Sequence, residues 1–267
     1  MGLFTATGYF LIVLVTVRAN SLESGSRIIG GVNYGIEKIP YQLSLEKSGK
    51  HICGATILGE KRAITAAHCT FGIPASELKV RVGSNQIQNG GQLIQVSNCS
   101  QHPNFDNITL ENDISILLLE NSIKMNKTIK AIDPNWKDAI KVNTTVLTSG
   151  WDGNILHALN LSIIDRDTCQ KYFTMVRLTN NKICATSNDT KNGPCEDDSG
   201  SALVLNNKLI GITSWTKCNS TNFPTIFTNV QNYEDFIKIY SNGVFKMSLS
   251  NIAYFICILH IIFNSFN

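Results

Sequence analysis

The stretch PCEDDSGSAL, residues 194–203, places Ser199 between Asp198 and Gly200, four residues after Cys195. A serine hydroxyl is a poor nucleophile near neutral pH. It becomes reactive where an imidazole accepts its proton and a buried carboxylate fixes the tautomer of that imidazole. If Ser199 is a nucleophile, the chain must therefore supply a histidine and an acidic residue from other segments.

Two short segments contain suitable partners. His68 lies in ITAAHC and Asp113 lies in ENDISILLL, so the linear order of the three residues is His, Asp, Ser. Taken singly, a histidine before a cysteine is usually structural, and an aspartate that opens an apolar strand is usually a turn residue. The combination of the three is what indicates acyl transfer through a covalent intermediate.

With these segments, the chain resembles the chymotrypsin/trypsin-like serine protease family. The resemblance runs from Arg27 to about Tyr240, and it also rests on RIIGG (27–31), SGW (149–151) and SW (214–215) followed by Cys218. It implies an all-β fold of two packed six-stranded antiparallel barrels with a C-terminal helix, and a cleft between the barrels. It implies that His68, Asp113 and Ser199 form the catalytic triad and that Ser214 hydrogen-bonds the triad aspartate.

The residue pattern independently favours an all-β class. Short runs are β-branched or alternate apolar with polar residues, and turn residues separate them. These runs are YQLSL, LKVRVG, GQLIQVS, DISILLL, TVLTSGW, SALVL, KLIGITSW and TIFTNV. One helix is predicted in NYEDFIKIYSN, residues 232–242, because apolar side chains recur there at helical spacing.

Chain length, composition and net charge limit the functions that the protein can have. A chain of 267 residues with 43% hydrophobic residues is long enough to bury a sizeable core. The net charge of +3 and the scattered basic residues argue against a nucleic-acid partner. No segment has the spacing of a zinc site, and the resemblance implies neither a metal nor a cofactor.

The first 19 residues are predicted to be a secretory signal peptide. An apolar run from Phe10 to Val17 precedes Val17-Arg18-Ala19, which has small residues where a signal peptidase reads. The alternative is a retained signal anchor, since no basic residue precedes the run. The run is, however, far shorter than the roughly 20 residues that span a bilayer. Removal near Ala19 and secretion are the favoured interpretation.

The resemblance also gives RIIGG a role in activation. Cleavage after Arg27 by an activating protease would free the amine of Ile28, which would form a buried ion pair with Asp198 and order the nucleophile loop. Residues 20–27 would then be an activation peptide, and residues 28–241 the protease domain. The protein is expected to be made as a zymogen.

Secretion changes how the eight cysteines are interpreted, because thiols in an oxidising compartment are usually paired. The resemblance assigns three disulfides, which are Cys53 with Cys69, Cys169 with Cys184, and Cys195 with Cys218. Cys257 lies in an apolar tail. Cys99 is left either as a free thiol or as a link to another chain.

Seven Asn-x-Ser/Thr sequons support an extracellular, glycosylated surface. They begin at Asn98, Asn107, Asn126, Asn143, Asn160, Asn188 and Asn219. Asn160 is the weakest, because it lies inside the alternating run ALNLSI.

Residues 242–267 form a hydrophobic C-terminal tail. Its apolar run, Ile252 to Phe263, is twelve residues long and marginal for a membrane-spanning helix. Small residues at Ser241-Asn242-Gly243, a spacer and an apolar end match a GPI-attachment signal. The alternative is a retained tail that is membrane-associated or partly buried. The protein is thus expected outside the cell, either free or tethered to the surface.

The nucleophile loop departs from the family pattern, whose usual run is Gly-Asp-Ser-Gly-Gly-Pro. Here it is Asp197-Asp198-Ser199-Gly200-Ser201-Ala202. The resemblance assigns the oxyanion hole to the backbone N–H groups of Asp197 and Ser199. A Cβ at the first position restricts the backbone, and its carboxylate would lie near the oxyanion. Losing one donor costs about 3 to 4 kcal/mol, so a slow enzyme or an inactive one is expected.

The primary specificity pocket also departs from trypsin. Its base aligns with Gly193, where trypsins carry an aspartate, and its walls align with Thr216 and Thr225. Threonine walls are expected to fill the pocket and leave room only for a small apolar side chain. The alternative is that the shortened loop between Trp215 and Pro224 rearranges and makes this alignment misleading.

Two functions follow. The first is a secreted serine endopeptidase that acts on protein or peptide substrates with small residues in its primary specificity pocket. Its other expected partners are protease inhibitors. The second is an inactive protease fold that binds substrates, inhibitors or host defence proteins. The three triad residues favour the first function, and the altered loop and pocket favour the second.

Overall fold

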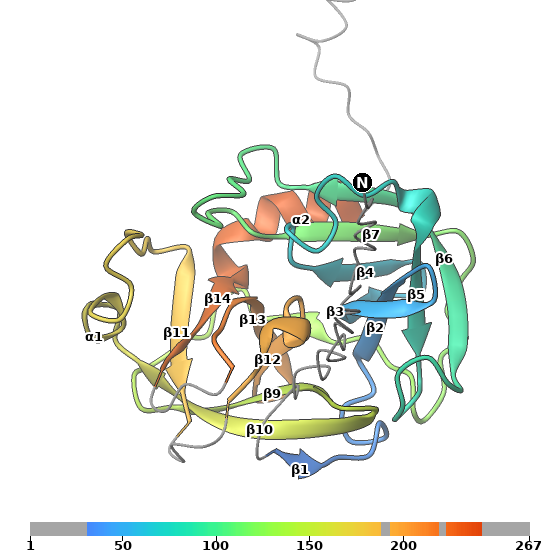
Figure 1. Ribbon diagram of the computed structural model, residues 1–267, viewed down its shortest axis with the longest axis horizontal. Coiled ribbons are helices and arrows are strands. Elements are labelled where there is room, and N and C mark those ends of the chain that lie inside the picture. The colour runs from blue at the N-terminus through green and yellow to red at the C-terminus, as the bar shows by residue number, and fades with distance from the viewer. Residues whose placement is uncertain (1–30, 188–192, 219–222, 242–267) are drawn as a thin grey trace, which may run out of the picture.

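The computed structural model describes residues 31–187, 193–218 and 223–241, and shows two β-barrels packed side by side (Figure 1). The elements are β1 (Val32–Asn33), β2 (Gln42–Lys47), β3 (Lys50–Gly59), β4 (Arg62–Thr65), η1 (Ala75–Glu77), β5 (Leu78–Val82), β6 (Gln92–Gln101), β7 (Ser115–Leu119), β8 (Asp133–Pro134), β9 (Thr145–Asp152), β10 (Ile155–Ile164), α1 (Arg166–Gln170), β11 (Lys182–Thr186), η2 (Glu196–Asp198), β12 (Ala202–Leu205), β13 (Lys208–Trp215), β14 (Thr225–Asn229), η3 (Val230–Tyr233) and α2 (Glu234–Ser241).

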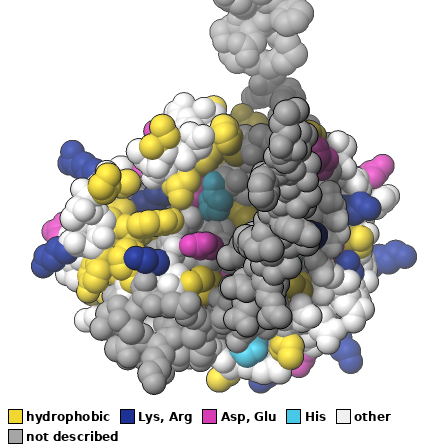
Figure 2. Space-filling model, in the orientation of Figure 1, with side chains coloured by type: hydrophobic (Ala, Val, Ile, Leu, Met, Phe, Trp, Pro, Cys, Tyr) yellow, Lys and Arg dark blue, Asp and Glu magenta, His cyan; other side chains and the backbone are white. Residues whose placement is uncertain are grey.

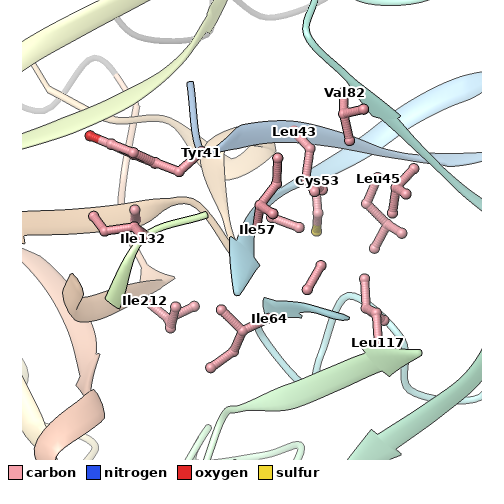
Figure 3. Close-up of a cluster of buried hydrophobic side chains, with 14 of the residues drawn as sticks. Tyr41, Leu43, Leu45, Cys53, Ile57, Ile64, Val82, Leu117, Ile132 and Ile212 are labelled. Atoms are coloured by element: carbon pink, nitrogen blue, oxygen red, sulfur yellow. The ribbon is translucent and has the colours of Figure 1, made fainter. Parts of the chain in front are cut away.

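The first barrel closes in the order β2-β3-β4-β7-β6-β5, with every neighbouring pair antiparallel. Its interior is filled by aliphatic side chains from β2, β3, β4 and β7, which converge in Figure 3. Leu43, Leu45, Ile57, Ile64 and Leu117 are all completely buried. Burial on this scale, at roughly 1.5 to 3 kcal/mol for each large aliphatic side chain, holds the barrel closed.

The second barrel contains six antiparallel strands in the order β10-β11-β14-β13-β12-β9, and the pairing of β9 with β10 closes it. Strand β1 adds to the outside of β10, and β8 pairs in parallel with β13. Asn206 and Asn207 both adopt positive φ in the two-residue turn from β12 to β13, as a tight hairpin turn requires. The predicted all-β fold of two six-stranded barrels is confirmed.

The predicted C-terminal helix is confirmed as α2, which continues from η3. Its residues Phe236 and Ile237 are buried, and the Phe236 ring lies 5.1 Å from the ring of His102. A second helix, α1, begins after Asp165, whose side chain accepts a hydrogen bond from the Thr168 N–H at 2.8 Å. This helix was not predicted, because five residues are too few to show helical periodicity.

Several predictions fall on residues outside the described ranges. These are the signal peptide, cleavage between Arg27 and Ile28, the hydrophobic tail, and the sequons at Asn188 and Asn219. Among the residues that the structure describes, no helix is long and apolar enough to cross a membrane.

Candidate active site

The residues predicted to carry the chemistry meet between the two barrels. His68 follows β4 and Asp113 precedes β7, so both come from the first barrel, while Ser199 follows η2 in the second barrel. His68, Ser199 and Ser214 line one cavity of about 440 Å³, together with Trp215. A substrate in this cavity would touch both barrels.

Asp113 is completely buried and fully hydrogen-bonded. Its Oδ1 accepts from the His68 backbone N–H at 2.9 Å, and its Oδ2 accepts from His68 Nδ1 at 2.8 Å and from Ser214 Oγ at 2.6 Å. Because a carboxylate only accepts, Nδ1 carries the imidazole proton and Nε2 is left to accept one. This is the tautomer that a general base needs.

The ionised form of Asp113 is favoured despite its burial. Burial raises the pKa of its carboxyl, but the hydrogen bond and charge of His68, the hydrogen bond from Ser214 and the charge of Lys182 together lower the pKa below its ordinary value. The carboxylate therefore remains negative where it can stabilise a protonated imidazole.

Ser199 is 6% exposed, at the floor of the cavity. The N–H of Gly54 on β3 donates to the Ser199 carbonyl at 2.8 Å, so the first barrel holds the backbone of this serine. In the described part of the chain, no hydrogen bond joins Nε2 of His68 to the Ser199 hydroxyl. Such bonds are often long before a substrate binds.

The backbone around Asp197 determines whether an oxyanion hole exists. Residues Glu196–Asp198 form the 3₁₀ helix η2, and the Ser199 N–H donates to the Glu196 carbonyl at 3.1 Å. One of the two expected oxyanion donors is thus engaged inside the loop. This turn must open before the Ser199 N–H can point at a substrate oxyanion.

A histidine that was not predicted contacts the same loop. His51 Nε2 donates to the Asp197 carbonyl at 3.1 Å, and Ser44 Oγ donates to His51 Nδ1 at 2.7 Å. A carbonyl only accepts, so both proton positions are fixed while the ring is neutral. The sequence signal for His51 was absent because its partners lie 7 and 146 residues away.

Asp198, the predicted partner of the Ile28 amine, is buried in the second barrel. It is 1% exposed, and its Oδ2 accepts from the Cys195 N–H at 2.8 Å. A Cβ added at Gly150 would lie 1.7 Å from Asp198 Oδ1, so the glycine of the SGW motif is required by this close approach. Ile28 lies outside the described ranges, so their ion pair stays a prediction.

Two departures from the family pattern are accommodated by their neighbours. Ser201 Oγ accepts from Gln42 Nε2 at 3.0 Å, and a Cβ at Gly54 would lie 1.9 Å from that oxygen. The lack of a side chain at Gly54 therefore makes room for the serine. Ala202 is buried at the start of β12. Asp197 is the departure that still bears on the chemistry.

The two predicted pocket walls contact each other. Thr216 Oγ1 donates its one proton to the Pro194 carbonyl at 2.7 Å, so the Thr225 hydroxyl must be the donor in the 3.1 Å hydrogen bond that joins Thr225 to Thr216. Both side chains are buried. At the predicted base, a Cβ added at Gly193 would meet no heavy atom of the described residues within 4 Å. The two predicted wall positions therefore hold side chains that contact each other, whereas the predicted base, a glycine, has no side chain.

The structure forms the disulfides Cys53–Cys69, Cys169–Cys184 and Cys195–Cys218. The sulfurs of Cys53 and Cys69 lie near His68, but they are bonded to each other and are not thiolate ligands. Cys99 is the free cysteine of the described ranges, and burial raises the pKa of its thiol to about 11.

A second cavity, of about 180 Å³, adjoins the first and shares Leu110, Ser214 and Trp215 with it. Its other apolar walls include Phe173, Leu178 and Ile226. Figure 2 shows hydrophobic side chains gathered on the side of the molecule that carries α1 and β11. Three charged residues that were not predicted, Glu111, Arg177 and Lys182, also line this cavity.

Comparisons with known proteins agree with this geometry. A family model described as Trypsin matches residues 28–237. Trypsin 5G1 of Aedes aegypti is 32% identical, over 82% of this chain and 86% of the relative. Hypodermin-A of Hypoderma lineatum is 34% identical, over 80% of this chain and 88% of the relative. Among solved structures, neuropsin, a serine protease expressed in the limbic system of mouse brain, matches with a TM-score of 0.73 and 27% identity, over 79% of this chain and 99% of its own.

Proposed function

Because the chain belongs to the trypsin family of serine proteases, we propose that it is a secreted serine endopeptidase of low activity, made as a zymogen and activated after Arg27. The observation that carries the proposal is the hydrogen bond between Asp113 and His68, together with the cavity that His68 lines with Ser199. This pair supplies a base of the correct tautomer beside a nucleophile.

In this mechanism Ser199 Oγ attacks the carbonyl carbon of the scissile peptide, and His68 Nε2 takes the hydroxyl proton. The protonated imidazole donates its Nδ1–H to Asp113, and Ser214 holds the second hydrogen bond to that carboxylate. His68 then gives its proton to the leaving amine, and water hydrolyses the acyl-enzyme by the same route. The oxyanion needs the N–H groups of Asp197 and Ser199, so η2 must open during the reaction.

Activation after Arg27 is supported by the burial of Asp198. A buried carboxylate is most stable beside a cation, and the new amine of Ile28 would supply one. The same event would place a charge next to η2, which ends at Asp198. Activation is thus proposed to change the loop that holds the oxyanion donors.

A fluorophosphonate probe tests the proposed activity directly. The chain is converted to its Ile28 form and exposed to the probe, and labelling is detected by mass spectrometry of the active-site peptide. We expect labelling of Ser199 that disappears completely in Ser199→Ala. Equal labelling in the two proteins, or no labelling in either, would contradict the proposal that the protein is a protease with Ser199 as its nucleophile.

A second candidate function is a binding protein without catalysis, which occupies substrates, inhibitors or host defence proteins. It is favoured by one observation, the engagement of the Ser199 N–H with the Glu196 carbonyl. If this turn never opens, the cleft can hold a peptide but cannot stabilise an oxyanion. Tight binding of a peptide inhibitor without probe labelling would establish this function instead.

The joined threonines predict a narrow preference for small residues before the scissile bond. Replacing Thr216 and Thr225 together with glycine removes both walls, and we expect kcat/KM for a phenylalanine substrate to rise about 10- to 100-fold relative to an alanine substrate. Paired peptide substrates that differ at this one residue measure the ratio. Thr186→Ala, on β11 outside this pair, serves as the control, and an unchanged ratio in the double variant would show that the pocket is shaped elsewhere.

Secretion and glycosylation are supported by the disulfides and by the exposure of the sequons. Asn107, Asn126, Asn143 and Asn160 all have exposed side chains, so the strand position of Asn160 is no obstacle to modification. Tethering through residues 242–267 is proposed as an alternative to a free protein. Release of the protein from cells by a phospholipase specific for GPI anchors distinguishes the two.

A further inference from the structure

Lys182, the first residue of β11, is linked to the buried carboxylate of Asp113 through the hydroxyl group of Ser214. Its Nζ donates to Ser214 Oγ at 3.3 Å, and Ser214 donates its own proton to Asp113 Oδ2 at 2.6 Å. Nζ also donates to the Leu110 carbonyl, which fixes the ammonium from its other side. The lysine is partly buried and lines the smaller cavity.

The direction of these hydrogen bonds is fixed at both ends, because the Asp113 carboxylate only accepts and the Lys182 ammonium only donates. An ammonium only donates, so it occupies a lone pair of the Ser214 hydroxyl. The single proton of that hydroxyl is then free to point at Asp113. A methionine or leucine at position 182 would remove the donor to Ser214 Oγ and the positive charge, so that only Asp113 would hold the Ser214 hydroxyl.

Glu111 places a second carboxylate in the same cluster. It accepts from Thr179 Oγ1 at 2.9 Å and from Asn181 Nδ2 at 2.8 Å, and it lies two residues before Asp113. Burial lowers the pKa of Lys182, while Asp113 and Glu111 oppose this effect. The two carboxylates thus help to keep the lysine protonated, and the lysine in turn offsets part of their negative charge.

The remaining titratable groups here do not replace this cation. The Tyr233 hydroxyl donates to Asn112 Oδ1 at 3.1 Å, and burial raises its pKa, so it stays neutral. The His102 ring packs on Tyr233 at 5.4 Å, and burial lowers its pKa. Glu196 lines the larger cavity and is exposed. Arg177 lines the smaller cavity with Lys182, but it is exposed, so solvent and salt screen its charge.

We propose that Lys182 is a positioning residue for the proton relay, acting through Ser214 on Asp113. It orients the Ser214 hydroxyl and sets how strongly the buried carboxylates attract a proton onto His68. With Lys182 the cluster of two carboxylates and one ammonium carries one net negative charge, and it becomes neutral when His68 is protonated. The proposal rests on the proposed function, since the relay matters only if His68 acts as a base.

The test measures the relay without requiring turnover. In the activated full chain, the His68 Nδ1 proton should give a far-downfield resonance in the proton NMR spectrum, and its position is followed against pH. We expect Lys182→Met, which keeps the side-chain length but removes the charge, to raise the titration midpoint by about one pH unit. Glu111→Gln, which removes a negative charge, is expected to lower it. Lys171→Met, at an exposed lysine after α1, is the matched control.

Each outcome separates the two proposals. An unchanged midpoint in a folded Lys182→Met protein would overturn the role of Lys182, even if the fluorophosphonate probe labels Ser199. If the titration midpoint shifts as expected but the fluorophosphonate probe labels nothing, the role of Lys182 is supported and the proposed endopeptidase activity is refuted. If Lys182→Met does not fold, Lys182→Gln keeps an N–H donor for Ser214 and must raise the midpoint in the same direction.

Discussion

Replacing Asp197 with glycine is expected to raise kcat/KM at least about tenfold, since one missing oxyanion donor costs about 10²- to 10³-fold in turnover. In the structure the Ser199 N–H donates to the Glu196 carbonyl within η2. Asp197 does not adopt a positive φ, whereas glycine does so at little cost. The peptide between residues 196 and 197 could then rotate its N–H toward the substrate and free the N–H of Ser199. Initial rates on a peptide with alanine before the scissile bond measure the change.

Two controls separate the backbone from the charge. Asp197→Asn removes the carboxylate but keeps the Cβ, so it should recover little activity if the backbone is the cause. Asp167→Asn removes an exposed carboxylate on α1 that lines neither of the two cavities, and it should leave the rate unchanged. The His51 hydrogen bond reaches the carbonyl of residue 197 and survives all of these substitutions. A rate for Asp197→Gly equal to that of the parent would show that the aspartate is already accommodated.

Asp113→Asn is expected to lower kcat/KM by about 10⁴-fold at neutral pH. The carboxylate accepts hydrogen bonds at both oxygens, and Oδ2 alone accepts from His68 Nδ1 and Ser214 Oγ. An asparagine that keeps its oxygen toward the His68 backbone N–H turns its NH₂ toward Nδ1. The imidazole then adopts the opposite tautomer and cannot take the Ser199 proton at Nε2. The measurement compares Asp197→Gly with the double variant Asp197→Gly/Asp113→Asn, because the higher rate expected for Asp197→Gly leaves room to measure a large loss.

The matched control is Asp106→Asn, an exposed aspartate in the same loop whose Oδ1 accepts from the N–H groups of Ile108 and Thr109. It should retain the parental rate within about threefold, since surface changes are usually mild. A loss of less than tenfold in a folded Asp113→Asn protein would mean that Asp113 does not orient the general base. Circular dichroism melts establish that both variants are folded.

Strands were predictable from the sequence where one face of a strand meets solvent or turn residues mark its ends. The run KLIGITSW coincides with β13, and TVLTSGW differs from β9 only by its last residue. Strand β3 was not predicted because five consecutive residues, 53–57, are buried on both faces and give no alternation. The short elements α1 and η2 follow from local hydrogen bonds that periodicity does not reveal.

The site residues also fall into two groups, those that could be identified from the sequence and those that could not. The structure brings together His68, Asp113 and Ser199, which a resemblance in short motifs had identified. Lys182 and Glu111 were missed, because their importance depends on the approach of β11 to the β6–β7 loop, about 70 residues away in sequence. A lysine at the start of a strand looks like an ordinary exposed charge until its neighbours are known.

The hydrogen bond from Gly54 to the Ser199 carbonyl, and the amide of Gln42 shared between Ser149 and Ser201, have a consequence for biosynthesis. The first barrel leaves the ribosome well before β12 and Ser199 are made, so it carries a histidine and an aspartate with no serine. Since Gln42 and Gly54 find these partners only in the second barrel, the nucleophile loop is completed after the barrels dock. A chain that ends before Ser199 therefore carries the histidine and the aspartate without a nucleophile, and the contacts that hold the nucleophile loop require both barrels to be present.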